Sequence, residues 1–146
     1  MRRREERRVP KMKEFTIAIE DKPGALGRCF LALAEGGVNI LAFQSFVDEG
    51  ESLARLLVDS PAKAKAVLGG LGMIFEETEV AAMRVANRPG TLGRAAAMLG
   101  GAKINIDYSY CGWEPGSVQA LMVFGVDNLS KAVNLLDELA REETAA

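Results

Sequence analysis

Two short turns carry the residues best suited to hold a small ligand: Asp21-Lys22-Pro23-Gly24 and Asn87-Arg88-Pro89-Gly90. In each turn, proline fixes φ and glycine lets the backbone close tightly before a helical run. The first N–H groups of a helix have no intrahelical partner, and the helix dipole is positive at that end. These groups suit a small anion such as a carboxylate. The alternative is that Pro-Gly forms only a compact turn.

The two turns belong to an internal repeat with a constant offset of 66 residues. The first copy reads DKPGALGRCFLALAEGGVNI (Asp21–Ile40), and the second reads NRPGTLGRAAAMLGGAKINI (Asn87–Ile106). A turn, a short helical run, a glycine and then Asn-Ile before β-prone residues are typical of a strand–turn–helix–strand unit. The repeat therefore predicts two small domains of the same kind.

Few residues of the chain are suited to catalysis. Histidine is absent, and the two cysteines, Cys29 and Cys111, lie far apart in the sequence. The commonest general base and the commonest metal ligand are therefore missing. No nucleophile stands beside a base, and no Walker loop or dinucleotide fingerprint occurs. We expect no catalytic residues, no metal and no cofactor, although Arg28 and Arg94 leave a phosphate-binding enzyme as an alternative.

Composition is that of a soluble globular protein, with 49% hydrophobic and 26% charged residues among 146. No apolar run approaches the roughly 20 residues that span a bilayer, and no secretion signal is recognisable. We therefore expect a cytoplasmic protein with reduced, packed thiols. The first 13 residues, MRRREERRVPKMK, hold seven positive and two negative side chains, whereas the rest of the chain is acidic. A basic arm can dock on an acidic partner, and nucleic acid remains a minor hypothesis.

Hydrophobic periodicity predicts the order β-α-β-β-α-β for the first repeat, which is the ferredoxin-like α+β arrangement. Ile40 and Ala42 are predicted on one face of the second strand, with Leu41 and Phe43 on the other. The predicted strands are Phe15–Ile19, Val38–Val47, Leu53–Val58 and one within Met73–Glu79. The first predicted helix buries Leu26, Phe30 and Leu33, and the second runs from Ser60-Pro61 to Gly69-Gly70.

The second repeat follows the same order but appears in the sequence without its last strand. Its strands are predicted at Val80–Val85, Ile104–Cys111 and Val118–Val126, with the turn GWEPGS before the last. After the final helix the chain ends. We therefore expect a basic arm (1–11), a first domain (12–79) and a second domain (80–146). The edge strand Ala81–Val85 would be unpaired, so an obligate dimer, the arm Val9–Lys13 or the run Met73–Val85 would have to cover it.

Asp21-Lys22-Pro23-Gly24-Ala25-Leu26 followed by Gly37-Val38-Asn39-Ile40 resembles the signature of the ACT domain, a small ligand-binding module of amino-acid-controlled enzymes. Asn87–Leu92 followed by Lys103–Ile106 resembles it equally well, and the resemblance covers about Met12 to Ala140. It implies a non-catalytic regulatory protein. A free amino acid would bind where the first turn of one domain meets the start of the second strand of a neighbour.

The resemblance also implies which residues bind the ligand. Asn87 departs from the pattern, because the first repeat has Asp21 at this position, so the second site is expected to be weaker or different. The residues implied are Asp21, Pro23, Gly24, Ala25, Leu26, Asn39 and Ile40 in the first repeat, and Asn87, Pro89, Gly90, Thr91, Leu92, Asn105 and Ile106 in the second.

Several functions remain open on the sequence. The chain could be a free-standing sensor or the small regulatory subunit of an amino-acid biosynthetic enzyme, and the repeats could serve assembly alone. An RNA-binding module shares the fold but needs stacking aromatic residues flanked by basic ones. Phe43, Phe46, Tyr108 and Tyr110 could be suspected, yet the strands around them are aliphatic and the body of the chain is acidic.

Overall fold

The computed structural model describes residues 9–112, 116 and 118–145. The described residues form two compact units. The first unit is Lys13–Thr78, and the second joins Glu79–Ala146 to the segment that ends at Met12. The elements are β1 (Lys11–Ile19), α1 (Ala25–Glu35), β2 (Ile40–Asp48), β3 (Glu51–Val58), α2 (Pro61–Gly70), β4 (Phe75–Ala86), α3 (Thr91–Gly101), β5 (Ile106–Tyr110), β6 (Gln119–Val126) and α4 (Leu129–Ala145).

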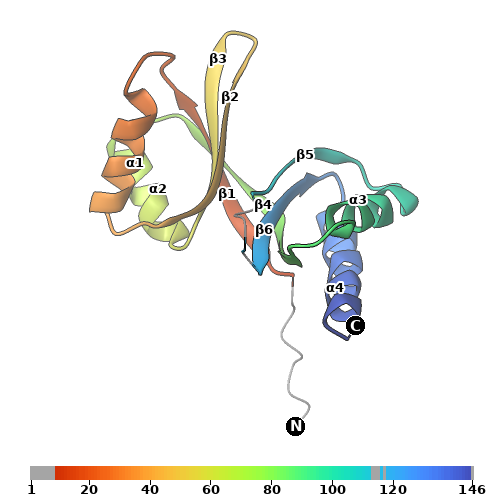
Figure 1. Cartoon of the computed structure of the whole chain (residues 1–146). Coiled ribbons are helices and arrows are strands. Elements are labelled where there is room, and N and C mark those ends of the chain that lie inside the picture. Colours follow the sequence, from red (N-terminus) through yellow and green to blue (C-terminus); the bar gives the residue numbers. More distant parts are fainter. Residues whose placement is uncertain (1–8, 113–115, 117, 146) are drawn as a thin grey trace. The chain divides into compact units, whose positions relative to one another are not determined.

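The first unit is a ferredoxin-like repeat with the strand order β2-β3-β1-β4. Helices α1 and α2 lie on the same face of its sheet (Figure 1). Between the helices and the sheet lies a hydrophobic core that includes Phe15, Ile17, Leu33, Leu56 and Leu68, all fully buried. The β-α-β-β-α-β order predicted for this repeat is therefore confirmed.

Local sequence signals explain how the helices and the hairpin of this unit begin and end. Helix α1 starts after Gly24, and α2 starts at Pro61, where proline fits because the first helical N–H needs no partner. Between β2 and β3 the chain reverses through Glu49 and Gly50, both with positive φ, and Asp48 pairs with Glu51. Two positive φ angles match the right-handed twist of the flanking strands.

The predicted faces of the second strand are wrong. The register of β2 against β3 shifts between Ile40 and Ala42, which marks a β-bulge. As a result Ile40 packs in the core beneath the helices, and Phe43 also turns to the helix side, with its ring 5.1 Å from that of Phe30 on α1. Simple alternation places these two residues on opposite faces because it does not include the extra residue of a bulge.

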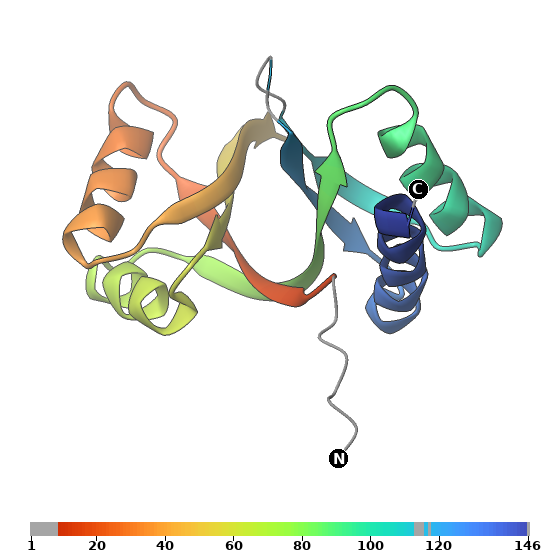
Figure 2. The ribbon, with the colours of Figure 1, turned by 60° about the horizontal axis from the view of Figure 1, so that its bottom comes forward.

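The second unit repeats this architecture with α3 and α4 on one face of its strands (Figure 2). Strand β6 lies between β4 and β5 and is antiparallel to both. A β-bulge recurs at the start of β5, between Ile106 and Tyr108. Fully buried core residues include Met83, Leu99, Phe124 and Leu136. The predicted turn GWEPGS falls mostly outside the described residues, as does most of the predicted basic arm.

The amino-terminal segment covers the edge at Ala81–Val85, which the second repeat leaves without a fourth strand of its own. The N–H of Ala82 donates a hydrogen bond to the carbonyl of Pro10 at 3.3 Å. Val9 is fully buried in the core of this unit, and its N–H donates to the Asp137 carboxylate of α4 at 3.3 Å. The start of β1 therefore supplies the strand that the second repeat lacks, which was one of the three covers expected from the sequence.

Strands β1 and β4 each contribute to both units. In the first unit, the N–H of Ala18 donates to the carbonyl of Ile74 at 3.1 Å, and Phe75–Thr78 completes the sheet. The strands predicted at Met73–Glu79 and Val80–Val85 form one continuous strand, β4. Within the described residues, no helix has the length and apolar character to span a membrane.

Candidate functional site

The two Pro-Gly turns have the same backbone geometry. Gly24 and Gly90 are the residues before α1 and α3, and their φ angles are 86° and 91°. L-residues rarely adopt this left-handed conformation, which explains glycine at both positions. Arg28 N–H donates to the Gly24 carbonyl at 3.0 Å, and Arg94 N–H donates to the Gly90 carbonyl at 2.9 Å. Neither helix has a side-chain cap.

The turn of the first unit leaves two backbone amides suited to an anion. The Ala25 N–H donates to the Lys22 carbonyl at 3.3 Å, so it is already satisfied. Helix geometry leaves the N–H groups of Leu26 and Gly27 without an intrahelical acceptor. A Cβ at Gly27 would meet no atom within 4 Å, so the space beside its Cα is open. The N–H groups available to a ligand at this turn are therefore those of Leu26 and Gly27.

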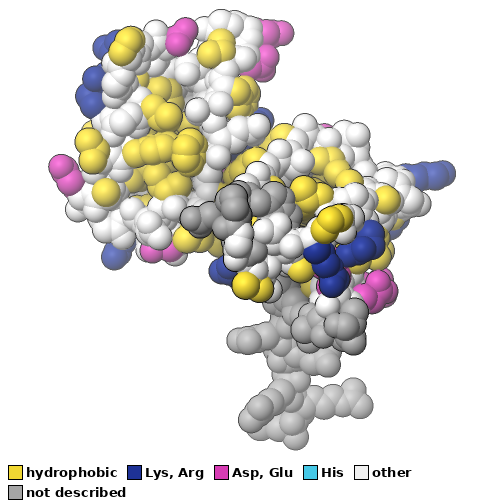
Figure 3. Space-filling model, viewed as in Figure 1, with side chains coloured by type: hydrophobic (Ala, Val, Ile, Leu, Met, Phe, Trp, Pro, Cys, Tyr) yellow, Lys and Arg dark blue, Asp and Glu magenta, His cyan; other side chains and the backbone are white. Residues whose placement is uncertain are grey.

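A hollow of about 850 Å³ adjoins this turn within the first unit. Figure 3 shows hydrophobic side chains gathered on the visible side of this unit, between α1 and the strands of Figure 1. The hollow extends from the turn and the start of α1 to the segment between α2 and β4. It is lined by Ala18, Ile19, Glu20, Lys22, Pro23, Ala25, Arg28, Cys29, Leu71, Gly72, Met73 and Ile74.

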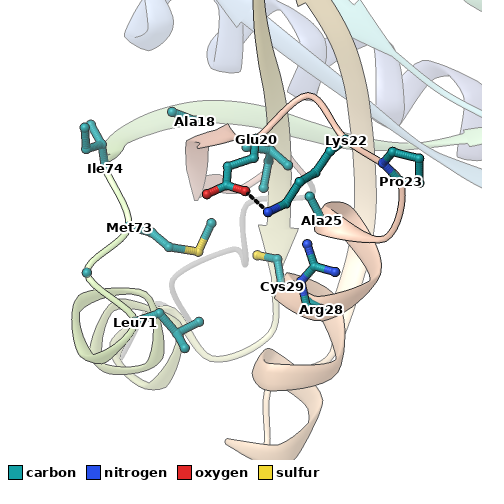
Figure 4. Close-up of a pocket in the computed structure, with 12 residues that line it drawn as sticks. Ala18, Glu20, Lys22, Pro23, Ala25, Arg28, Cys29, Leu71, Met73 and Ile74 are labelled. Atoms are coloured by element: carbon teal, nitrogen blue, oxygen red, sulfur yellow. Dashed lines mark ion pairs between the residues drawn. The ribbon is translucent and has the colours of Figure 1, made fainter.

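Three charged side chains lie at the turn side of the hollow (Figure 4). The Lys22 ammonium lies 2.5 Å from the Glu20 carboxylate, and both side chains are largely exposed. The hydrogen bond from Lys22 lowers the pKa of Glu20, its charge adds to this effect, and the Arg28 charge contributes a smaller part. Two cations and one carboxylate give this side of the hollow a net positive charge.

The opposite side of the hollow is apolar. Leu71, Met73 and Ile74 come from the segment after α2, and Leu71 and Ile74 are 52% and 78% exposed. Cys29 projects from α1 toward the same space (Figure 4). Burial raises the pKa of the Cys29 thiol, so the thiol stays protonated and behaves as a small apolar group. This arrangement can hold a small molecule that has one polar end and one apolar end.

A smaller hollow of about 260 Å³ lies on the other side of the same turn. Asp21 and Leu26 contribute to it, together with Ser45, Phe46 and Leu53 from the β2–β3 hairpin. The turn residues named from the sequence therefore divide between two hollows. Pro23 and Ala25 face the larger one, whereas Asp21 and Leu26 face the smaller one.

Asn39 and Ile40 lie at the other end of the first unit. Helix α1 has 11 residues, so about 16 Å of helix separates the turn from the start of β2. The Asn39 N–H donates to the Asp59 carboxylate at 2.9 Å. Asn105 repeats this contact with Asp127 at 3.1 Å in the second unit, where α3 separates it from Gly90 in the same way. Within one repeat, therefore, the structure does not bring the predicted turn residues and asparagines together.

The second turn has different surroundings from the first. Arg94 and Arg88 lie 2.5 Å and 3.8 Å from the carboxylate of Glu143, near the end of α4. Thr91 is fully buried, and its hydroxyl has no hydrogen-bond partner among the described residues. Pro89, Gly90 and Leu92 surround it in sequence; Asn87 is held through its N–H, which donates to the Val118 carbonyl at 3.0 Å.

The site residues missed from the sequence are Glu20, Lys22, Cys29 and the segment Leu71–Ile74. For Arg28 the signal was present, because Arg94 repeats it at the same offset. The segment Leu71–Ile74 reaches the turn only through the packing of α2, so no local pattern could have placed it there.

The fold and its paired turns define a tandem of ferredoxin-like modules. The family model described as "ACT domain pair" matches residues 11–142, and the chain belongs to this family. The expected resemblance is therefore confirmed. The search of curated proteins gave no significant match.

Solved structures with the same fold include a protein from Bacteroides thetaiotaomicron, with a TM-score of 0.80, 24% identity and coverage of 90% of each chain. The ligand-free regulatory subunit of aspartate kinase from Thermus thermophilus is also similar, with a TM-score of 0.64 and 14% identity over 89% of this chain and 93% of that one. A third is E. coli aspartokinase III in complex with lysine and aspartate, with a TM-score of 0.57 and 16% identity over 92% of this chain and 32% of that one.

Proposed function

We propose that this protein is a non-catalytic regulatory protein that binds a free amino acid. The observation that carries the proposal is the glycine-capped start of α1, which opens on a hollow with charged groups on one side and apolar groups on the other. Membership of the ACT domain pair family supports a regulatory role. A part of E. coli aspartokinase III has a similar fold, and that enzyme was solved in complex with lysine and aspartate.

The groups of the first hollow can match each part of an amino acid. A carboxylate fits the positive end of α1, where Ala25 and Arg28 line the hollow. An ammonium group fits the Glu20 carboxylate, and an apolar side chain fits Met73 and Leu71. Recognition of this kind needs no proton transfer and no nucleophile, so the proposed protein binds its ligand and does not turn it over.

The full proposed set of binding residues includes matching positions of both repeats. Each turn would be completed by the asparagine of a neighbouring module, since the turn and the asparagine of one repeat are far apart. The proposed binding residues remain Asp21, Pro23, Gly24, Ala25, Leu26, Asn39, Ile40, Asn87, Pro89, Gly90, Thr91, Leu92, Asn105 and Ile106.

Assembly is the second candidate function. Strand β2 is the outer strand of the first unit's sheet, and its Phe43 and Val47 are 50% and 61% exposed. An exposed apolar edge strand favours pairing with another chain. We therefore propose a homodimer or larger oligomer, or docking on an amino-acid biosynthetic enzyme, in a reducing cytoplasm where both free cysteines persist.

A thermal-shift screen of the full chain against the 20 standard L-amino acids tests the proposed function. A ligand at 100 times its dissociation constant adds about 2.7 kcal/mol to the free energy of unfolding, which raises the melting temperature by several degrees. The matching D-amino acids at the same concentrations control for salt effects. No stabilisation by any L-amino acid at 10 mM, roughly 100 times a Kd of about 0.1 mM, would leave assembly as the better explanation.

A further inference from the structure

The second unit holds a carboxylate of its own chain at the turn before α3. Glu143 lies 2.5 Å from the Arg94 guanidinium, and its side chain is only 10% exposed. Arg88, within the same turn, lies 3.8 Å from the same carboxylate. A carboxylate that is largely removed from water and faces two guanidinium groups is held by charge-assisted interactions. The turn of this unit is therefore already occupied by an anion.

Arg28 is the counterpart of Arg94 in the first unit. Both residues follow the turn glycine by four positions, and both donate their backbone N–H to the carbonyl of that glycine. Their guanidinium groups also lie close to the turn glycine, on the side where a Cβ would be. A Cβ added at Gly24 would lie 3.0 Å from Nη1 of Arg28, and one added at Gly90 would lie 3.5 Å from Nη1 of Arg94. The two cations thus have the same place relative to their turns.

The first unit has no counterpart of Glu143. Helix α4 has 17 residues, whereas α2 has 10 and is followed by Leu71–Ile74 before β4. The seven extra residues of α4 add about 10 Å of helix, which brings Glu143 to Arg94. In the first unit Arg28 lines the large hollow. Among the described residues no carboxylate forms a salt bridge with Arg28, and Glu20 pairs with Lys22 instead.

We propose that Arg28 anchors the carboxylate of the ligand in the first hollow, in the way that Arg94 holds Glu143 in the second unit. This inference rests on the proposed function and makes it more specific. The ligand is an α-amino acid with an aliphatic or thioether side chain, which lies against Leu71, Met73 and Cys29. The second turn binds a carboxylate more weakly, because Glu143 competes for the place beside Arg94, so the tighter site of each chain is the one at Arg28.

The test follows the side-chain Nε–Hε signals of both arginines by NMR on the full-length, ¹⁵N-labelled protein. The probe is isovalerate, a branched monocarboxylate that retains the carbon skeleton and the carboxylate of valine but lacks the ammonium group. Isovaleramide, which has the same shape without the charge, is the matched control probe. We expect isovalerate to shift the Arg28 signal in a saturable way, isovaleramide to leave it unmoved, and neither to move the Arg94 signal.

Three variants sharpen the result. In R28Q the affinity for isovalerate should fall by about tenfold, the effect of losing a hydrogen bond to a charged group. In R94Q the affinity at Arg28 should stay within about twofold of the wild type, because the two arginines serve different units. In E143Q the Arg94 signal should begin to respond to isovalerate. If the Arg94 signal in E143Q did not respond to isovalerate, an arginine at this position of the turn would not bind a free carboxylate. The comparison from which the role of Arg28 is inferred would then fail.

The outcomes separate this inference from the proposed function. An Arg28 signal that ignores isovalerate, or arginines that respond equally in the wild type, would overturn the inference even if an amino acid stabilises the protein. If isovalerate binds at Arg28 but no amino acid shifts the melting temperature, the carboxylate site stands and the amino-acid function fails. If an amino acid does stabilise the protein, L-valine and L-valinamide provide the direct comparison, with valinamide expected to bind about tenfold more weakly.

Discussion

The Asp59 carboxylate accepts a hydrogen bond from the backbone N–H of Asn39 at 2.9 Å, and the Asp59 N–H donates to the Asn39 carbonyl at 3.0 Å. These two hydrogen bonds tie the start of β2 to the residue that follows β3. Asp127 and Asn105 form the same pair at 3.1 Å and 3.3 Å. The asparagines expected to bind a ligand thus have a structural role through their backbone atoms, and the side-chain amide of Asn105 also donates to the Asp107 carboxylate at 2.9 Å.

Replacing Asp59 with alanine should lower the free energy of unfolding by about 1 to 2 kcal/mol, because the Asn39 N–H loses its acceptor. Asp59→Asn keeps an acceptor oxygen and should lose less. Urea denaturation measures both. Asp48→Ala, at the exposed end of β2, is the matched control and should change stability little. If Asp48→Ala destabilised the protein as much as Asp59→Ala, the hydrogen bond between Asp59 and Asn39 would not explain the lower free energy of unfolding.

Gly24→Ala and Gly90→Ala should each lower the free energy of unfolding by about 1 to 2 kcal/mol, because an L-residue is strained at the positive φ of these positions. Gly27→Ala serves as the control. It lies inside α1 with open space around its Cβ, so it should be neutral or stabilising by up to about 1 kcal/mol. Thermal and urea denaturation distinguish these cases, and a neutral Gly24→Ala would contradict the strained turn.

Val9→Ala should destabilise the protein by about 1.5 to 3 kcal/mol, although Val9 lies close to the chain's amino terminus. The side chain is fully buried in the core of the second unit, and the change removes two methyl groups and leaves a cavity. Pro10→Ala, at the exposed neighbouring residue, should have little effect. Equal stability of Val9→Ala and the wild type would show that the amino-terminal segment does not complete this unit.

Cys29 should react slowly with iodoacetamide near neutral pH. Burial raises the pKa of its thiol above the ordinary value of 9.0, so the reactive thiolate is scarcer than in an unfolded chain. The folded state favours the protonated thiol, so this contribution to stability is present below pH 9 and is lost as the pH rises through the raised pKa. Labelling rates of Cys111→Ala between pH 7 and pH 10 isolate Cys29. A rate equal to that of the urea-unfolded protein would contradict the buried thiol.

Local sequence signals were sufficient for the helices and turns, but they left three candidates for the strand that completes the second unit. Pro-Gly before α1 and the glycine pair at the end of α2 act within a few residues, so they could be identified without a structure. The pairing of Pro10 with Ala82 depends on residues 72 positions apart, and nothing near Pro10 indicates its partner. The bulge at Leu41 was missed because one inserted residue reverses the alternation on which strand faces were assigned.

The candidate site was predictable only in part, for the same reason. The turn residues and Arg28 repeat in the sequence and could be recognised from that repetition. The apolar side of the hollow comes from Leu71–Ile74, about 50 residues after the turn, and Glu143 reaches Arg94 only because α4 continues for seven residues more than α2. Such differences between repeats follow from chain length and packing rather than from a motif.

The hydrogen bond from Val9 to Asp137 has a consequence for the order in which the chain folds during synthesis. The two residues are 128 positions apart, so Val9 is made long before the helix that receives it. At about 5 to 20 residues per second, the amino-terminal segment waits about 6 to 25 seconds for its partner. The first unit can form during that interval, but the second closes only after synthesis of α4. The earliest part of the chain to be synthesised is therefore among the last to reach its final place.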